Sequence, residues 1–157
     1  MMERIQVTSA SGIVMSLHGG EWRIHASAVD DGKVIEDSLN WLSGGKSKIM
    51  IHKENSTLGA PMQTISVKMK AKAALSSLEM LEKESLSSML ENGLGSRVDE
   101  DKFLHIRLSL DLVVQGRAVI SRRTEEPVVK GKFKLEVYPG SESIEVAEDL
   151  LMRLIGE

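Results

Sequence analysis

Lys130, Lys132 and Lys134 occupy alternate positions in a stretch, residues 129–138, whose other positions are mostly apolar. A period of two residues is typical of a half-buried β-strand, so the three ammonium groups are expected to share one face of a sheet. Clustered ammonium groups can neutralise phosphates, which is the chemistry of nucleic-acid backbone binding. The pattern therefore indicates anion binding and does not by itself indicate a catalysed reaction.

The same alternation recurs in residues 22–28, 46–53, 64–70 and 103–108. If these strands form one sheet, its free face collects cations against few acids, chiefly Glu136. The cations expected there are Arg23, Lys48, Lys68, Lys70, His105, Arg107, Lys130, Lys132 and Lys134. A chain of net charge -3 would then have a concentrated cationic surface.

A simpler explanation competes with a binding face. Lysine is common on the solvated side of an antiparallel sheet, and it also protects edge strands against aggregation. However, most acidic residues of this chain lie in segments that are predicted to be helical. Such segregation of charge favours a nucleic-acid-binding face.

Three amphipathic helices are predicted from apolar positions spaced three or four residues apart. They cover about residues 34–42, 71–90 and 143–155, and we expect any break in the second near residues 83–85. Their apolar stripes must pack against the apolar side of the sheet. The predicted fold is an α+β two-layer sandwich: a mainly antiparallel sheet has helices packed on one face and an open, basic face on the other.

The length of 157 residues favours one α+β domain over residues 22–157, preceded by an N-terminal extension or short hairpin in residues 1–21. The chain has no cysteine, which excludes disulfides and thiolate metal sites. No apolar run approaches the ~20 residues of a membrane-spanning helix, and the N-terminus does not resemble a signal peptide. We expect a cytoplasmic protein that does not enter membranes.

Motifs for catalysis are not supported. The stretch Gly44-Gly45-Lys46-Ser47 resembles the end of a phosphate-binding loop, but Asn40 replaces the required glycine and the stretch follows a helix instead of preceding one. A zinc site of His25, His52 and His105 is chemically possible, yet histidines on separate strands are more often solvated or structural. We predict no catalytic residue, cofactor or metal, and a protein that is not an enzyme.

Three stretches resemble an archaeal family that is known as RNA-binding and as a predicted exosome subunit. They are Arg97-Val98-Asp99 with the strand Phe103–Leu108 and Gly116, the turn Ser56–Pro61, and Asp30–Val34. The chain departs from the family pattern at Ala28-Val29, Ser56 and Ser109-Leu110-Asp111. The resemblance implies a fold similar to that of the ribosomal protein that holds 5S ribosomal RNA, and it adds Arg97 to the candidate RNA-binding residues.

Phe103 and Tyr138 are the only aromatic residues expected on the basic face, whereas base recognition in single-stranded RNA usually needs stacking rings. We therefore expect structured RNA to be bound mainly through its phosphates, as an accessory factor of RNA processing or of the exosome. The alternative is a non-catalytic dimerisation or assembly module that uses the open face or an edge strand, with Met50 among its apolar candidates. An enzyme acting on a small molecule or phosphate ester ranks last.

Overall fold

The computed structural model describes residues 17–27, 31–55 and 57–156, in which five strands form one antiparallel sheet in the order β2-β3-β1-β5-β4. The strands are β1 (Leu17–Ser27), β2 (Ile49–Asn55), β3 (Pro61–Lys70), β4 (Phe103–Ser109) and β5 (Val128–Leu135). The helices are α2 (Gly32–Leu42), α3 (Ala71–Glu79), α4 (Lys83–Glu91), α5 (Leu110–Val114) and α6 (Ser143–Gly156).

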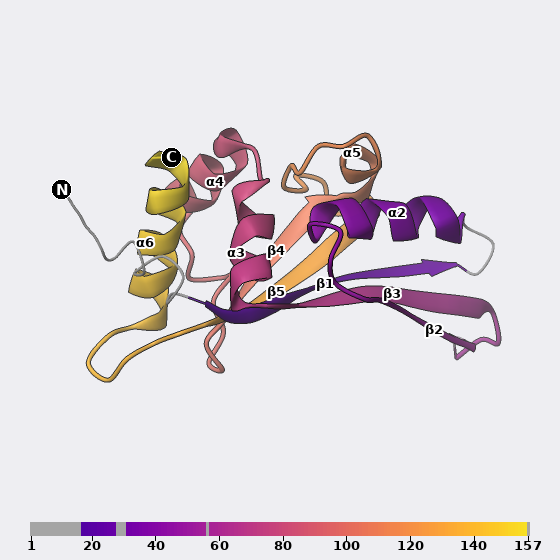
Figure 1. The fold of residues 1–157 in the computed structure, drawn as a ribbon, viewed down its shortest axis with the longest axis horizontal. Helices are drawn as coiled ribbons and strands as arrows, with labels where there is room; N and C mark the ends of the chain where they lie inside the picture. The colour runs from indigo at the N-terminus through magenta and orange to yellow at the C-terminus, as the bar shows by residue number, and fades with distance from the viewer. Residues whose placement is uncertain (1–16, 28–30, 56, 157) are drawn as a thin grey trace.

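All of these helices lie on one side of the sheet, and no helix of the described residues lies over the other side (Figure 1). The side chains of β1, β3, β4 and β5 alternate between buried and exposed positions along most of their length. Such alternation is what one packed face and one free face require. The predicted α+β sandwich, with helices on one face and the other face open, is confirmed.

The centre of the core is a pair of aromatic rings on neighbouring strands. Trp22 of β1 and Phe133 of β5 are fully buried and meet edge to face, with ring centroids 5.0 Å apart. Each ring lies over a glycine of the other strand: a Cβ on Gly131 would come within 2.4 Å of the Trp22 ring, and one on Gly20 within 2.3 Å of Phe133. No larger residue fits at either glycine without displacing an aromatic ring.

A buried hydrogen-bond relay joins this core to the helices. Trp22 Nε1 donates to Ser77 Oγ of α3 at 2.7 Å, and Ser77 Oγ donates to the carbonyl of Leu42 at the end of α2 at 2.6 Å. Ser77 is 1% exposed, so no solvent competes with these bonds. One hydroxyl therefore fixes two helices relative to the central strand.

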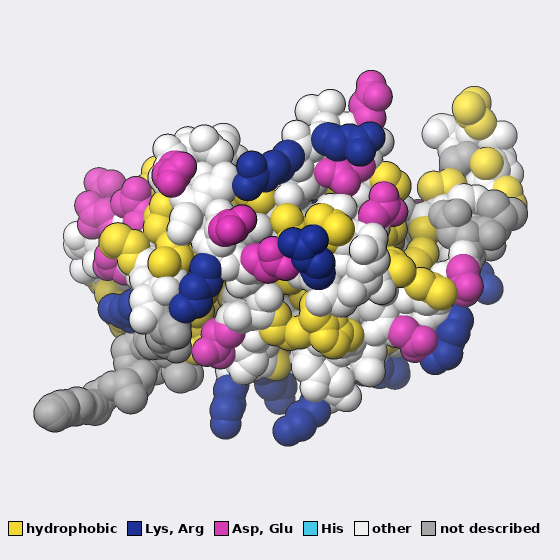
Figure 2. All heavy atoms as spheres, turned by 90° about the horizontal axis from the view of Figure 1, so that it is seen from above, with side chains coloured by type: hydrophobic (Ala, Val, Ile, Leu, Met, Phe, Trp, Pro, Cys, Tyr) yellow, Lys and Arg dark blue, Asp and Glu magenta, His cyan; other side chains and the backbone are white. Residues whose placement is uncertain are grey.

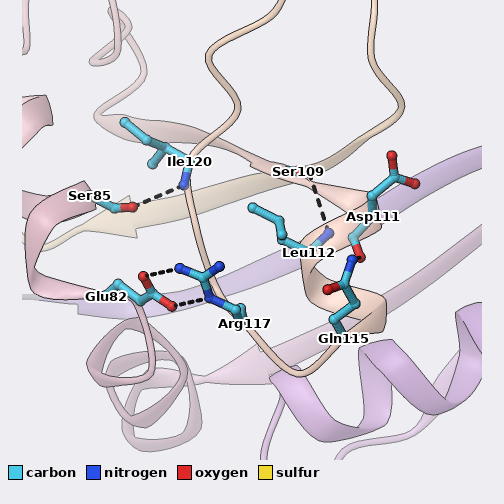
Figure 3. A network of polar contacts seen from close by, with 8 residues as sticks. All are labelled: Glu82, Ser85, Ser109, Asp111, Leu112, Gln115, Arg117 and Ile120. Atoms are coloured by element: carbon cyan, nitrogen blue, oxygen red, sulfur yellow. Dashed lines mark hydrogen bonds and ion pairs between the residues drawn. The ribbon is translucent and has the colours of Figure 1, made fainter.

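A second network holds the segment that follows α5 against the link between α3 and α4 (Figure 3). Arg117 makes a bidentate ion pair with Glu82, at 2.8 and 2.9 Å, and Ser85 Oγ accepts from the backbone N–H of Ile120. Ile120 also forms an isolated bridge to Leu108 of β4. The outer edge of β4 is thus partly covered by this segment.

Several boundaries differ from the sequence predictions. The long helix is two helices, because residues between α3 and α4 leave the helical path where Leu81 bridges Ala118. β1 begins at Leu17, five residues before the predicted strand; residues 1–16, where most of the predicted extension or hairpin falls, lie outside the described residues. Tyr138, which was expected on the basic face, lies three residues past the end of β5 and is therefore outside the sheet.

Within the described chain, no helix is long and apolar enough to cross a membrane.

Replacing Ser77 by Ala should lower the free energy of unfolding by about 2 to 4 kcal/mol, because it leaves a buried indole N–H and a buried carbonyl without partners. Urea denaturation followed by tryptophan fluorescence measures this change. Ser76 is exposed on the same helix, so Ser76→Ala is the matched control and should change little. Equal effects of the two substitutions would contradict the relay.

Candidate nucleic-acid interface

The uncovered side of β1, β3, β4 and β5 is termed the open face. Residues directly opposite each other in antiparallel strands project from the same side of a sheet, so the observed register shows which side chains are neighbours. Three rows cross the open face: Phe103, Lys134, Gly19 and Lys70; His105, Lys132, Glu21 and Lys68; and Arg107, Lys130, Arg23 and Ser66. Cations from four strands therefore converge on one surface.

The rows contain most of the residues that the sequence analysis predicted to bind RNA. These are Arg23, Lys68, Lys70, His105, Arg107, Lys130, Lys132 and Lys134. Lys48 instead precedes β2 by one residue and lies outside the paired rows, although it is exposed. Arg97 lies beside β4, where its carbonyl accepts from the N–H of His105 at 2.7 Å. It is half-buried, and burial lowers the pKa of its guanidinium.

Two of the lysines are held in place over an aromatic ring. The ammonium groups of Lys132 and Lys134 lie 4.3 and 4.7 Å from the centroid of the Phe103 ring. Lys134 Nζ also donates to the carbonyl of Asp101 at 2.6 Å. Because these contacts restrict long, flexible side chains, part of the ordering entropy that ligand binding requires is already lost in the free protein.

Histidines of the open face sit in different electrostatic surroundings. The pKa of His25 is lowered from its ordinary value by burial and by the nearby cations Lys130 and Arg23. His105 Nε2 instead meets Asp99 Oδ2 at 2.6 Å. The hydrogen bond from His105, with backbone N–H groups that bond the same carboxylate, lowers the pKa of Asp99. Nearby cations therefore disfavour the charged form of His25, whereas the Asp99 carboxylate lies against His105.

Glu21 is the acid that the sequence analysis missed. It lies in the middle row between Lys132 and Lys68, and its side chain is only 17% exposed. Its Oε2 accepts from the guanidinium of Arg23 at 3.1 Å. The expected acid, Glu136, lies past the end of β5, 3.9 Å from His18 Nε2. Extending the alternation of residues 22–28 backward by one residue would have placed Glu21 on this face.

Two shallow hollows adjoin Glu21 on the open face. One, of about 250 Å³, is lined by Glu21, Arg23, His25, Lys130 and Lys132 among others. The other, of about 270 Å³, extends over Gly19 toward Lys68, Lys134 and Phe103. Glu21 and Lys132 line both hollows. These volumes lie just below the ~300 Å³ at which small-molecule pockets begin.

Metal ligation has little geometric basis in the described ranges, since no group of three His, Asp or Glu side chains there could hold an ion. The histidines that the sequence suggested have separate partners instead: His25 bonds Thr64, His52 lies 3.7 Å from Glu54, and His105 bonds Asp99.

The helical side of the molecule looks different. Figure 2 is a view onto the helices, where acidic, basic and hydrophobic side chains are intermixed. Exposed hydrophobic residues there include Val34, Trp41 and Val114, which line a groove between α2 and α5. The excess of cations over acids in the rows of the open face is therefore absent from this view of the surface.

The fold and this face define a class of protein: an α+β sandwich that presents one side of an antiparallel sheet as a polycationic surface. The family model described as RNA binding matches residues 21–135, and the chain belongs to that family. No curated protein sequence matches the chain.

Solved structures share the fold at low sequence identity. A DUF54 protein from Methanothermobacter thermautotrophicus is 18% identical with a TM-score of 0.71, and the alignment covers 89% of this chain and 98% of that chain. A DUF54 protein from Sulfolobus solfataricus is 16% identical, with a TM-score of 0.64 over 86% and 98% of the two chains. A UPF0201 protein from Methanococcus jannaschii is 11% identical, with a TM-score of 0.57 over 85% and 92%.

Replacing Lys130 by Gln should raise the pKa of His25 toward its ordinary value, because one of the cations that disfavours the imidazolium is removed. An NMR titration of the His25 ring measures the shift. Lys83→Gln on α4, away from the open face, is the control and should leave the His25 pKa unchanged. If Lys130→Gln leaves the His25 pKa unchanged, Lys130 does not contribute to the positive potential at His25.

Proposed function

We propose that this chain binds structured RNA through the open face, mainly by contacts between its cations and RNA phosphates. The observation that supports the proposal most directly is the register, which aligns lysines and arginines of β1, β3, β4 and β5 in adjacent rows. Each phosphate neutralised by such a cation releases counterions, which is the main source of sequence-independent affinity for nucleic acids.

Two features favour structured RNA over an unpaired strand. An RNA double helix presents a wide, shallow minor groove and its phosphates, which an open sheet with shallow hollows can approach. Stacking of successive unpaired bases would need free aromatic rings. Trp22 and Phe133 are buried, and the Phe103 ring already has two ammonium groups over it.

The proposed role is binding and not catalysis, within an RNA-processing complex such as the exosome. The support for that complex is the family resemblance of residues 97–116. Membership of the RNA-binding family supports the RNA part of the proposal.

Salt dependence tests the proposed mode of binding. With about six phosphate contacts, affinity for a hairpin RNA should fall by about 10³-fold between 50 and 200 mM salt. Replacing Lys130, Lys132 and Lys134 together with Gln should lower the slope of log affinity against log salt by about three. Filter binding over a salt series measures both quantities, and circular dichroism checks that the variant is folded.

A control variant with the same charge change should bind like the wild type. Lys33, Lys83 and Arg153 belong to α2, α4 and α6 on the helical side, and their replacement by Gln leaves the open face intact. The proposal fails if this control loses as much affinity as the open-face variant, or if wild-type binding hardly depends on salt.

A second candidate function is self-association through β2. This strand is at the edge of the sheet, and Met50 and Ile51 on its two sides are 56% and 46% exposed. Ile51 projects from the same side of the sheet as the buried Ile65 opposite it, but helices cover this edge too little to bury it. An edge strand with free backbone groups and exposed apolar side chains can pair with another copy.

Under this second candidate, the chain should sediment as a dimer at about 10 to 100 µM, and replacing Met50 and Ile51 together with Lys should convert it to a monomer. The two lysines add charge repulsion at the edge and remove apolar contact area. Sedimentation velocity measures the mass, and Lys33→Gln is a control that should leave it unchanged. A wild-type monomer over this range would exclude the candidate.

A further inference from the structure

We propose that Glu21 recognises a guanine base of the bound RNA, one that is unpaired and turned out of the helix onto the centre of the open face. The inference rests on the proposed function, because it names the base that the same face would accept. It adds a single base-specific contact to binding that is otherwise dominated by phosphates.

The position of Glu21 is unfavourable for a surface that only binds phosphates. A carboxylate at the centre of the cation rows repels a polyanion, and its neighbours Lys132 and Lys68 are the residues that would contact phosphates. The side chain is fixed and not loosely solvated, since it is 17% exposed and its Oε2 accepts from Arg23. A fixed acceptor in the middle of a binding face can recognise a donor of the ligand.

The Glu21 carboxylate has acceptor capacity left for a ligand. Among the described residues, Arg23 is the ion-pair partner found for Glu21, while the ammonium of Lys132 lies over the Phe103 ring. A carboxylate has about four lone-pair sites, so one bond from Arg23 leaves room for two more donors. Both hollows beside it open onto this group.

Guanine is the base whose chemistry fits these acceptors. Its Watson–Crick edge has two adjacent donors, N1–H and N2–H, next to the O6 acceptor, and unpaired bases in RNA are recognised on this edge. Adenine, cytosine and uracil each present a single donor group there, beside acceptors that a carboxylate would repel. Lys68, the neighbour of Glu21 on β3, can donate to O6 while Glu21 accepts from the two N–H groups.

The shape of the site also suits a single base. The hollows, about 250 and 270 Å³, are small for a drug-sized ligand and meet at Glu21. Gly19 occupies the position between Lys134 and Lys70, so no side chain stands there above the sheet. A flipped base can therefore lie close to the backbone of β1 while its phosphates stay near the surrounding lysines.

Binding of hairpin RNAs that differ in one bulged base tests the inference. The wild type should bind the guanine bulge about 5- to 150-fold more tightly than the adenine bulge, the range expected for a bidentate contact. An inosine bulge, which lacks the N2 amino group, should fall between them. Fluorescence anisotropy at fixed salt measures the three affinities.

Two variants of Glu21 separate base recognition from a simple charge effect. In Glu21→Gln, one acceptor becomes a donor, so the preference should disappear or turn toward adenine, which suits an amide. Glu21→Ala should bind all three hairpins with affinities within about twofold of each other. The matched control is Glu54→Gln, which removes an acid of β2 on the same side of the sheet and should keep the guanine preference.

Equal wild-type affinity for the three bulges would overturn the inference, as would a guanine preference that survives both Glu21 substitutions. If Glu21→Gln and Glu54→Gln merely strengthen binding to every hairpin equally, Glu21 only balances charge. In each of these cases a steep salt dependence would still uphold phosphate-dominated binding. If the wild type binds none of the hairpins at 50 mM salt, the proposed function and this inference are both overturned.

Discussion

The packing of Trp22 and Phe133 over the two glycines is the constraint on which the rest of the structure depends. The rings lock β1 against β5, and the Trp22 indole then reaches Ser77 and, through it, Leu42. A slip of one residue between these strands would turn every inward side chain outward. Core packing on one face therefore determines which cations stand side by side on the other.

This coupling explains how a chain with more acidic than basic residues can maintain a cationic surface. Repulsion among the lysines opposes folding, yet the strand register is set by apolar burial, which contributes more than surface charge does. Contacts within the face reduce the repulsion: Glu21 pairs with Arg23, and the Phe103 ring attracts two ammonium groups. The remaining charge is available to an anionic ligand.

The sequence predicted side-chain directions that depend on a single strand, but it did not predict burial that depends on how several segments pack together. Alternation predicted the outward direction of Lys130, Lys132 and Lys134, because the pleat of a strand fixes it locally. The same rule turns Ile51 toward the side of the buried Ile65 opposite it, but Ile51 stays 46% exposed, because only the assembled fold determines how much of that side the helices cover. Glu21 was missed because the predicted strand began at Trp22, whereas β1 begins at Leu17 and Gly20 makes room for Phe133 inside the strand.

The two borders of the sheet are not equivalent. The segment held by Arg117 and Ser85 covers part of β4, so its backbone groups there are already used, whereas β2 has no strand on its outer side in the described chain. Strand-to-strand addition at β2 alone is self-complementary and ends after two copies, because backbone groups of Phe103, His105, Arg107 and Ser109 on the opposite border already have partners within the chain. Such one-sided geometry prevents open-ended polymerisation into fibres, even though the sheet has a free edge.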